Sequence, residues 1–245
     1  MRLLVTRPEP DAAALKAQLI GMGHEVLIEP LLHVLFPMLQ PGDIDLEEAQ
    51  ALVATSRNGV RALAQSPFLS AAVGLPIYCV GPGTAATARA LGYELVLAGP
   101  SDARALLEFV AENAQVNGGS LVYLAGETKA ADVGGELRHL GFHVQEPVVY
   151  AVKPADRLSA PIVARFEAGE VDGVLLLSPQ TARTYARLVL AHGLSAKALR
   201  GVHFCLSQAV ARGLAALGAP RTAIASQPDL KSLLALVARG VSDLP

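Results

Sequence analysis

The chain has 245 residues, of which 52% are hydrophobic and 17% charged, so it can bury a substantial core and is not disordered in bulk. Its 20 Lys and Arg residues are balanced by 22 Asp and Glu residues, which leaves no basic field to attract DNA or RNA. Aromatic residues make up only 4%, too few for the stacking surfaces that read single-stranded nucleic acid. We therefore expect no nucleic-acid partner.

The first ten residues predict a cytoplasmic protein. Only three consecutive apolar residues, 3–5, precede Thr6, Arg7 and Pro8, which is too short for the apolar stretch of a signal peptide. No run of about 18 apolar residues follows, so we expect no membrane partner. Cys79 and Cys205 lack the CxxC spacing of redox or zinc sites and are predicted to be buried strand residues.

Short apolar runs alternate with helical segments along the whole chain, a pattern typical of a parallel sheet covered by helices. In chain order we expect strands at residues 2–6, 25–30, 51–56, 76–81, 93–99, 121–126, 143–152, 173–178 and 202–207. The helices expected between and after them span residues 10–23, 58–65, 83–92, 101–113, 131–141, 180–190, 209–218 and 227–237. The predicted fold class is α/β.

The second half of this pattern repeats the first. Residues 79–92 overlay residues 205–218 without a gap, so that Cys79 falls on Cys205 and Gly92 on Gly218. A second overlay places Ser56 on Ser178, an offset of 122 against 126 for the cysteines, hence a difference of four. An internal duplication of about 120 residues predicts two similar α/β domains.

The carboxyl ends of parallel strands are where α/β proteins bind ligands, because helix N-termini point into that crevice. Here these ends carry hydroxyls, amides, glycines and cations, and Glu127 is their only carboxylate. This composition favours an anionic ligand over a magnesium ion. The residues concerned are Thr6, Arg7, Thr55, Ser56, Arg57, Asn58, Gly81, Pro82, Gly83, Thr84, Gly126, Glu127, Thr128, Lys129, Ser178, Gln180, Ser207 and Gln208.

Two other motifs have weaker support. Residues 81–86 read GPGTAA and match a dinucleotide fingerprint, with Asp102 about 20 residues on, but the fingerprint belongs on the first strand of its unit. We interpret it as a tight turn before a helix and keep nucleotide binding as an alternative. His139 and His143 have metal-pair spacing, yet Gly141 should end the helix between them, so we expect no metal site.

For each of four polar residues the sequence leaves a structural and a functional role open. Ser56 and Ser178 lack the G-x-S-x-G context of a nucleophile, so they are helix caps, ligand donors or both. Arg7 is either a solvated residue at a helix start or a ligand contact. Tyr150 is either a packing residue or an acid.

The segments LLVTRPEP, ATSRNGV, YCVGPGTAATARALGY, VVYAVKP and LLLSPQTA together resemble the uroporphyrinogen-III synthase family, and the likeness spans nearly the whole chain. The resemblance implies two flavodoxin-like lobes joined by two crossing connector segments, at about residues 35–38 and 150–153. One lobe would combine residues 1–34 with 154–245, and the other would span 38–149. The repeat alone would place the boundary near residue 118.

The resemblance also implies a function. Proteins of this family cyclise hydroxymethylbilane, a linear tetrapyrrole with eight carboxylates, with inversion of ring D and loss of water, and use neither metal nor organic cofactor. This chain would then be a monomeric lyase, with hydroxymethylbilane synthase as a transient partner. Tyr150 matches the tyrosine that assists loss of the hydroxyl. The implied substrate contacts are Arg7, Ser56, Asn58, Gly81, Thr84, Lys129, Ser178, Gln180 and Ser207.

One segment departs from the family pattern. Where the family often reads GPTTA before the last repeat helix, this chain reads SQAVA, so Val210 replaces a threonine and Ser207 replaces a glycine. Backbone N–H groups at that helix start, helped by Ser207 or Gln208, could replace the lost side-chain contact. The alternative function is a non-enzymatic two-lobed protein that binds or senses a small anion.

Overall fold

The chain forms two compact units in the computed structural model, which describes residues 1–99, 102–129 and 131–239. Unit 1 comprises Met1–His33 and Lys153–Pro245, and unit 2 comprises Val34–Val152. Each unit contains one five-stranded parallel sheet covered by helices, which confirms the predicted α/β class with two similar domains. Ser101, expected at a helix start, and residues 240–245 of the predicted first lobe lie outside the described residues.

The sheet of unit 1 has the strand order β13-β12-β11-β1-β2, and all of its pairings are parallel. Numbered within the unit, this order is 2-1-3-4-5 read from the β2 edge, the flavodoxin-like arrangement. The central strands are buried throughout because helices cover both faces of the sheet. The strands are β1 (Arg2–Val5), β2 (Glu25–Ile28), β11 (Gly173–Leu176), β12 (Val202–Cys205) and β13 (Thr222–Ile224).

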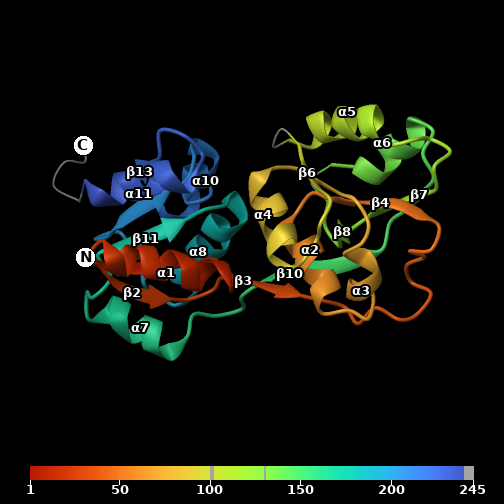
Figure 1. The fold of residues 1–245 in the computed structure, drawn as a ribbon. Coiled ribbons are helices and arrows are strands. Elements are labelled where there is room, and N and C mark those ends of the chain that lie inside the picture. Colours follow the sequence, from red (N-terminus) through yellow and green to blue (C-terminus); the bar gives the residue numbers. More distant parts are fainter. Residues whose placement is uncertain (100–101, 130, 240–245) are drawn as a thin grey trace. The chain divides into compact units, whose positions relative to one another are not determined.

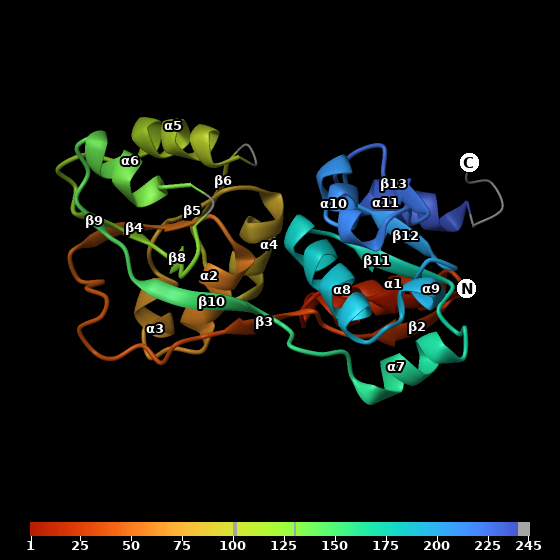
Figure 2. The ribbon, with the colours of Figure 1, turned by 180° about the vertical axis from the view of Figure 1, so that it is seen from behind.

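Helices cover this sheet on two faces. Helices α1 (Asp11–Gly21) and α11 (Leu230–Ala238) bury Leu15 and Leu233 against one face, which Figure 1 presents to the viewer. The other face, presented in Figure 2, packs against the remaining helices and includes the buried Tyr185. These helices are α7 (Ala160–Glu167), α8 (Pro179–Ala191), α9 (Ser195–Ala198), α10 (Gln208–Arg212) and the short 3-10 helix η1 (Ala215–Leu217).

The sheet of unit 2 has the order β6-β5-β4-β7-β9, again parallel. Its strands are β4 (Ala49–Ala54), β5 (Ile77–Cys79), β6 (Val96–Ala98), β7 (Ser120–Tyr123) and β9 (Val144–Gln145). Helices α5 (Ala103–Asn113) and α6 (Val133–His139) pack on one face, and α2 (Arg57–Ala64), α3 (Leu69–Ala72) and α4 (Pro82–Ala90) on the other (Figure 1).

The two sheets have the same spatial order although the chain builds them in a different sequence. With Ser56 placed on Ser178, β4 coincides with β11, and Cys79 and Cys205 then pair with equivalent residues of those strands. Strands β7 and β9 of unit 2 occupy the places that β1 and β2 occupy in unit 1. This arrangement confirms the duplicated fold, and it makes the two units comparable residue by residue.

A third sheet has the order β3-β10-β8, with β3 (Leu32–Leu35), β10 (Val148–Pro154) and β8 (Ala125–Gly126). The boundaries between the units fall within β3 and β10. The single strand expected over residues 143–152 was wrong, because β9 ends at Gln145 and β10 starts at Val148. Pro147, which lacks a backbone N–H, lies in this break.

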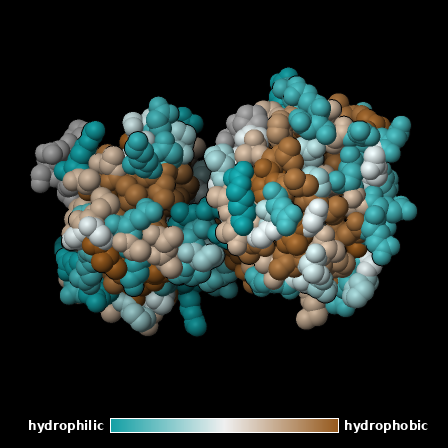
Figure 3. Space-filling view, viewed as in Figure 1, coloured by the Kyte–Doolittle hydropathy of each residue, from teal (hydrophilic) through white to brown (hydrophobic). Residues whose placement is uncertain are grey.

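Surface and helix length add two observations. On the face shown in Figure 3, apolar side chains reach the surface in both units, with hydrophilic side chains among them. Among the described residues, no helix is long and apolar enough to cross a membrane.

Candidate functional site

Unit 2 has a cavity at the topological switch point of its sheet. From β4 the chain continues to β5 on one side, and from β7 it continues to β9 on the other, so the segments after β4 and β7 diverge. Parallel α/β sheets bind ligands at such a point. A cavity of about 310 Å³ lies there, and its lining includes Thr55, Val80, Asp102, Ala103, Tyr123, Gly126, Thr128, Lys129, Ala131, Val133 and Tyr150.

Two hydroxyls meet at this cavity. Tyr123 ends β7 and is in register with Val53 of β4, so Thr55, two residues further along, lies on the same side of the sheet. The Tyr123 hydroxyl and Thr55 Oγ1 are 3.1 Å apart. Tyr123 is only 3% exposed, and its burial raises the pKa of its hydroxyl, so the group stays protonated at neutral pH.

Tyr150 also lines the cavity, from β10. It pairs with Gly126 of β8, and its ring lies against that glycine. A Cβ atom at residue 126 would come within 2.6 Å of the Tyr150 ring, so only glycine leaves room for the ring in this position. The Tyr150 hydroxyl is close enough to contribute to the raised pKa of Tyr123.

A carboxylate not foreseen from the sequence lies beside the cavity. Glu146 bonds Lys129 Nζ at 2.6 Å and Arg138 Nη2 at 2.9 Å, and only 12% of its side chain is exposed. Its hydrogen bond raises the pKa of Lys129, which therefore remains a cation. Lys129, expected to meet a substrate carboxylate, is thus already paired. Glu146 was not predicted as a site residue, because the sequence predicts one continuous strand over residues 143–152. In the structure Glu146 lies where that strand is broken, between β9 and β10.

The other predicted residues of unit 2 lie at helix starts. Ser56 caps α2 by accepting a hydrogen bond from the Asn58 backbone N–H at 3.1 Å. The Asn58 side chain accepts a 3.4 Å hydrogen bond from Arg61. Gly81 is the N-cap of α4, and Thr84 is buried with 6% exposure. Of the residues that the family resemblance implies, Lys129 and Tyr150 line the cavity described above, together with Thr55, Gly126 and Thr128 from the predicted strand ends.

The predicted residues of unit 1 follow the carboxyl ends of three of its strands. Arg7, after β1, forms a 2.9 Å ion pair with Asp11 of α1. Ser178, after β11, caps α8 and contacts the Thr181 hydroxyl at 2.8 Å, while Gln180 in the same helical turn is exposed. Ser207, after β12, caps α10.

The departure from the family pattern in this region is a core position. Val210 is 1% exposed and packs in the cluster that includes Leu214. Its side chain therefore cannot meet a ligand in this conformation, and the anion-binding groups left at this helix start are backbone N–H groups and the Ser207 hydroxyl.

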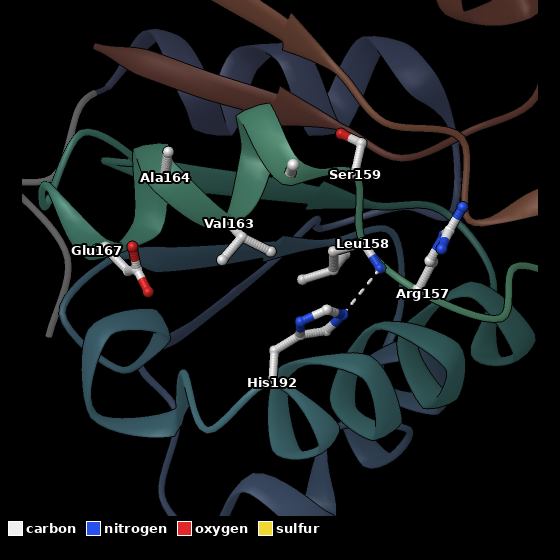
Figure 4. Close-up of a pocket in the computed structure, with 8 residues that line it drawn as sticks. Arg157, Leu158, Ser159, Val163, Ala164, Glu167 and His192 are labelled. Carbon is white, nitrogen blue, oxygen red and sulfur yellow. Dashed lines mark hydrogen bonds between the residues drawn. The ribbon is translucent and has the colours of Figure 1, made fainter.

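Unit 1 also has a cavity of about 660 Å³ against α7 and α8 (Figure 4). Its walls include Leu158, Val163 and His192, and His192 Nε2 accepts a 3.2 Å hydrogen bond from the Leu158 backbone N–H. Figure 4 shows Arg157 and Glu167 at opposite ends of the lining. Because its charged groups do not converge, this cavity is a weaker candidate than the one in unit 2.

Both cysteines are buried. Burial raises the pKa of Cys79 to about 11 and that of Cys205 to about 12, so both thiols stay protonated and unreactive at neutral pH.

The acidic residue of the dinucleotide fingerprint and the two histidines with metal-pair spacing lie at helix ends or beyond them. Asp102, the residue that follows the GPGTAA motif by about 20 positions, caps α5 by accepting a 2.8 Å hydrogen bond from the Ala105 backbone N–H. His139 is the last residue of α6, and His143 lies beyond Gly141, which has a φ of +93°.

A family model described as uroporphyrinogen-III synthase HemD matches residues 13–235. The chain belongs to the uroporphyrinogen-III synthase family. Membership makes it an enzyme of tetrapyrrole biosynthesis and confirms the expected family. No curated protein matches the sequence.

Solved structures of uroporphyrinogen-III synthases have a similar fold. The protein from Helicobacter pylori is 19% identical with a TM-score of 0.63, and the alignment covers 98% of this chain and 99% of that one. A mutant from Thermus thermophilus is 16% identical with a TM-score of 0.51, covering 98% of both chains. At these identities the likeness concerns the fold, and it extends over nearly the whole chain.

Proposed function

We propose that this protein cyclises hydroxymethylbilane to uroporphyrinogen III, with inversion of ring D and loss of water. The observation that carries the proposal is the cavity of unit 2, which Tyr150 and Lys129 line at the switch point of the sheet. Membership of the uroporphyrinogen-III synthase family supports the same function. Helix N-termini and cations near the strand ends of each unit suit a substrate with eight carboxylates.

Tyr150 is the proposed proton donor. Its phenolic proton passes to the terminal hydroxyl of the substrate, the C–O bond breaks, and the electron pair leaves with the oxygen as water. The pyrrole nitrogen supplies electrons, which leaves a cationic azafulvene on the substrate and a phenolate on Tyr150. General acid assistance of this kind is typically worth about 10² to 10⁴ in rate.

Ring closure returns the proton. The substituted carbon of ring D attacks the azafulvene, and the resulting spiro intermediate reopens and closes with ring D inverted. The proton that the ring carbon then loses restores the Tyr150 phenol. Reactant and product differ only by one water, so the reaction needs no oxidant or reductant, and we propose a cofactor-independent lyase. The protein's main contribution is to hold the chain in the geometry of the spiro step.

The decisive experiment is incubation with enzymatically made hydroxymethylbilane, followed by separation of the type I and type III isomers. We expect the type III isomer to dominate, because uncatalysed closure gives the type I isomer. A product mixture identical to that formed without protein would contradict the proposal and favour a non-enzymatic anion-binding protein.

Neutralising Glu146 is expected to tighten substrate binding. Glu146→Gln removes the carboxylate that now occupies Lys129 and Arg138, so both cations become available to substrate carboxylates. We expect KM to fall severalfold at low ionic strength and to rise more steeply with salt than in the wild type, because the interaction is screened. Steady-state kinetics between about 0.05 and 0.5 M salt measure both effects. A KM unchanged at every salt concentration would show that these cations do not face the substrate.

A further inference from the structure

The hydroxyl pair Tyr123–Thr55 has no counterpart in unit 1. Strands β4 and β11 are equivalent, and Tyr123 pairs with Val53 as Val5 pairs with Leu175. Val5 therefore occupies the position of Tyr123, and by the same alignment Leu177 occupies the position of Thr55. The same sheet position is thus apolar in one unit and carries two hydroxyls in the other, so the fold itself does not require the hydroxyls.

The hydroxyls of Tyr123 and Thr55 keep hydrogen-bonding capacity that the described residues do not satisfy. The contact between them is the only hydrogen bond that either makes within the described residues. Two hydroxyls bring two protons, and one contact uses one of them. One proton therefore remains to be donated, and both side chains line the cavity. A buried donor without a partner costs free energy, so a ligand atom in the cavity would gain from this proton.

The two tyrosines of the cavity differ in their surroundings. Tyr123 is almost fully buried and lies in the core cluster with Val53 and Leu121, whereas Tyr150 is half-buried. Burial raises the pKa of Tyr123, which suits it to donate a hydrogen bond without losing its proton. Pairs of titratable groups in different environments often divide the roles of proton transfer and hydrogen-bond donation.

We propose that Tyr123, oriented by Thr55, is a second catalytic residue that donates a hydrogen bond to the departing oxygen of the substrate while Tyr150 transfers its proton to that oxygen. The inference rests on the proposed function. Tyr123 keeps its proton throughout, so the balance of atoms and charges given for Tyr150 is unchanged. The added hydrogen bond is strongest while breaking of the C–O bond runs ahead of proton transfer from Tyr150, because electron density then builds up on the oxygen before it leaves as water.

The test is a double-mutant cycle of Tyr123→Phe and Thr55→Val, with type III product as the readout. We expect Tyr123→Phe to lower kcat by at least tenfold with KM changed less than threefold, since the lost contact acts mainly in the transition state. Thr55→Val should lower kcat by a smaller factor. The double variant should be no slower than Tyr123→Phe, because Thr55 acts through Tyr123.

Two controls separate catalysis from stability. Tyr93→Phe removes a buried hydroxyl that has no hydrogen-bond partner among the described residues, and Tyr93 packs in the core cluster on the opposite face of the same sheet. It should leave kcat unchanged. Thr55→Ser keeps the hydroxyl and should retain most of the wild-type kcat. The comparison of Thr55→Ser with Thr55→Val still tests the proposal if Tyr123→Phe fails to fold.

Three results would overturn the inference: wild-type kcat in a folded Tyr123→Phe protein, multiplicative losses in the double variant, or equal kcat in Thr55→Val and Thr55→Ser. These outcomes differ from a failure of the proposed function. A wild-type protein that forms no type III isomer would remove the function and the inference together, whereas an active wild type with an unaffected Tyr123→Phe variant removes the inference alone.

Discussion

Tyr150→Phe should lower turnover by more than about tenfold, because the variant keeps the ring and loses the proton donor. Folding should hardly change, since the Tyr150 hydroxyl makes no hydrogen bond to the described part of the chain, and the ring that packs against Gly126 is retained. Measuring kcat beside the midpoint of thermal unfolding separates the two effects. Turnover at the wild-type rate would reduce Tyr150 to a packing residue.

A companion variant tests the position of the same hydroxyl. Gly126→Ala places a methyl group within 2.6 Å of the ring carbon that carries the hydroxyl, so the ring must move while its chemistry stays intact. A misplaced donor is expected to cost nearly as much turnover as a missing one. Wild-type kcat in Gly126→Ala would mean that the reaction tolerates a displaced Tyr150.

Acid should destabilise unit 1 through His203. This residue of β12 is fully buried, and its ring nitrogens contact the Tyr185 hydroxyl and the Arg221 carbonyl oxygen, each at 3.3 Å. Burial lowers its pKa from 6.5 to about 4, so the folded protein favours the neutral imidazole. Stability from this group is complete above pH 6.5 and is lost as the pH falls toward 4, by roughly 3 kcal/mol.

The measurement is the free energy of unfolding by urea between pH 7 and pH 4, for the wild type and for His203→Leu combined with Tyr185→Phe. Changing both residues avoids leaving the Tyr185 hydroxyl buried without a partner. The slope of stability against pH should be shallower in the double variant by an amount that matches one proton. Parallel pH profiles would show that His203 does not titrate on unfolding in this range.

Local periodicity was sufficient to predict the class and the duplication. The gapless overlay of residues 79–92 on 205–218 corresponds to two strands that pair with equivalent neighbours, β5 with β4 and β12 with β11. The boundary that the repeat alone suggests differs from the division into compact units, because strand pairing depends on contacts between distant residues. Residue 118, where the repeat would place a boundary, lies between α5 and β7, and both pack within unit 2.

The candidate site was only partly predictable for the same reason. Tyr150 was accessible through its family motif and Lys129 through its place at a strand end. Tyr123 was not, because LVYLAG shows no sign that its tyrosine lies beside a hydroxyl from β4, roughly 70 residues earlier. Glu146 was missed because residues 143–152 are continuously compatible with one strand, and only tertiary packing breaks them at Pro147.

The way unit 2 interrupts unit 1 has a consequence for synthesis on the ribosome. Strand β1 pairs with β2 on one side, but its other neighbour, β11, begins at Gly173. All the strands of the five-stranded sheet of unit 2 lie within Val34–Val152, so that sheet can close before β11 has emerged. The fragment β1-α1-β2 must therefore wait, with one edge of β1 unpaired, until β11 has been translated, and an unpaired apolar strand edge is prone to pair with other chains.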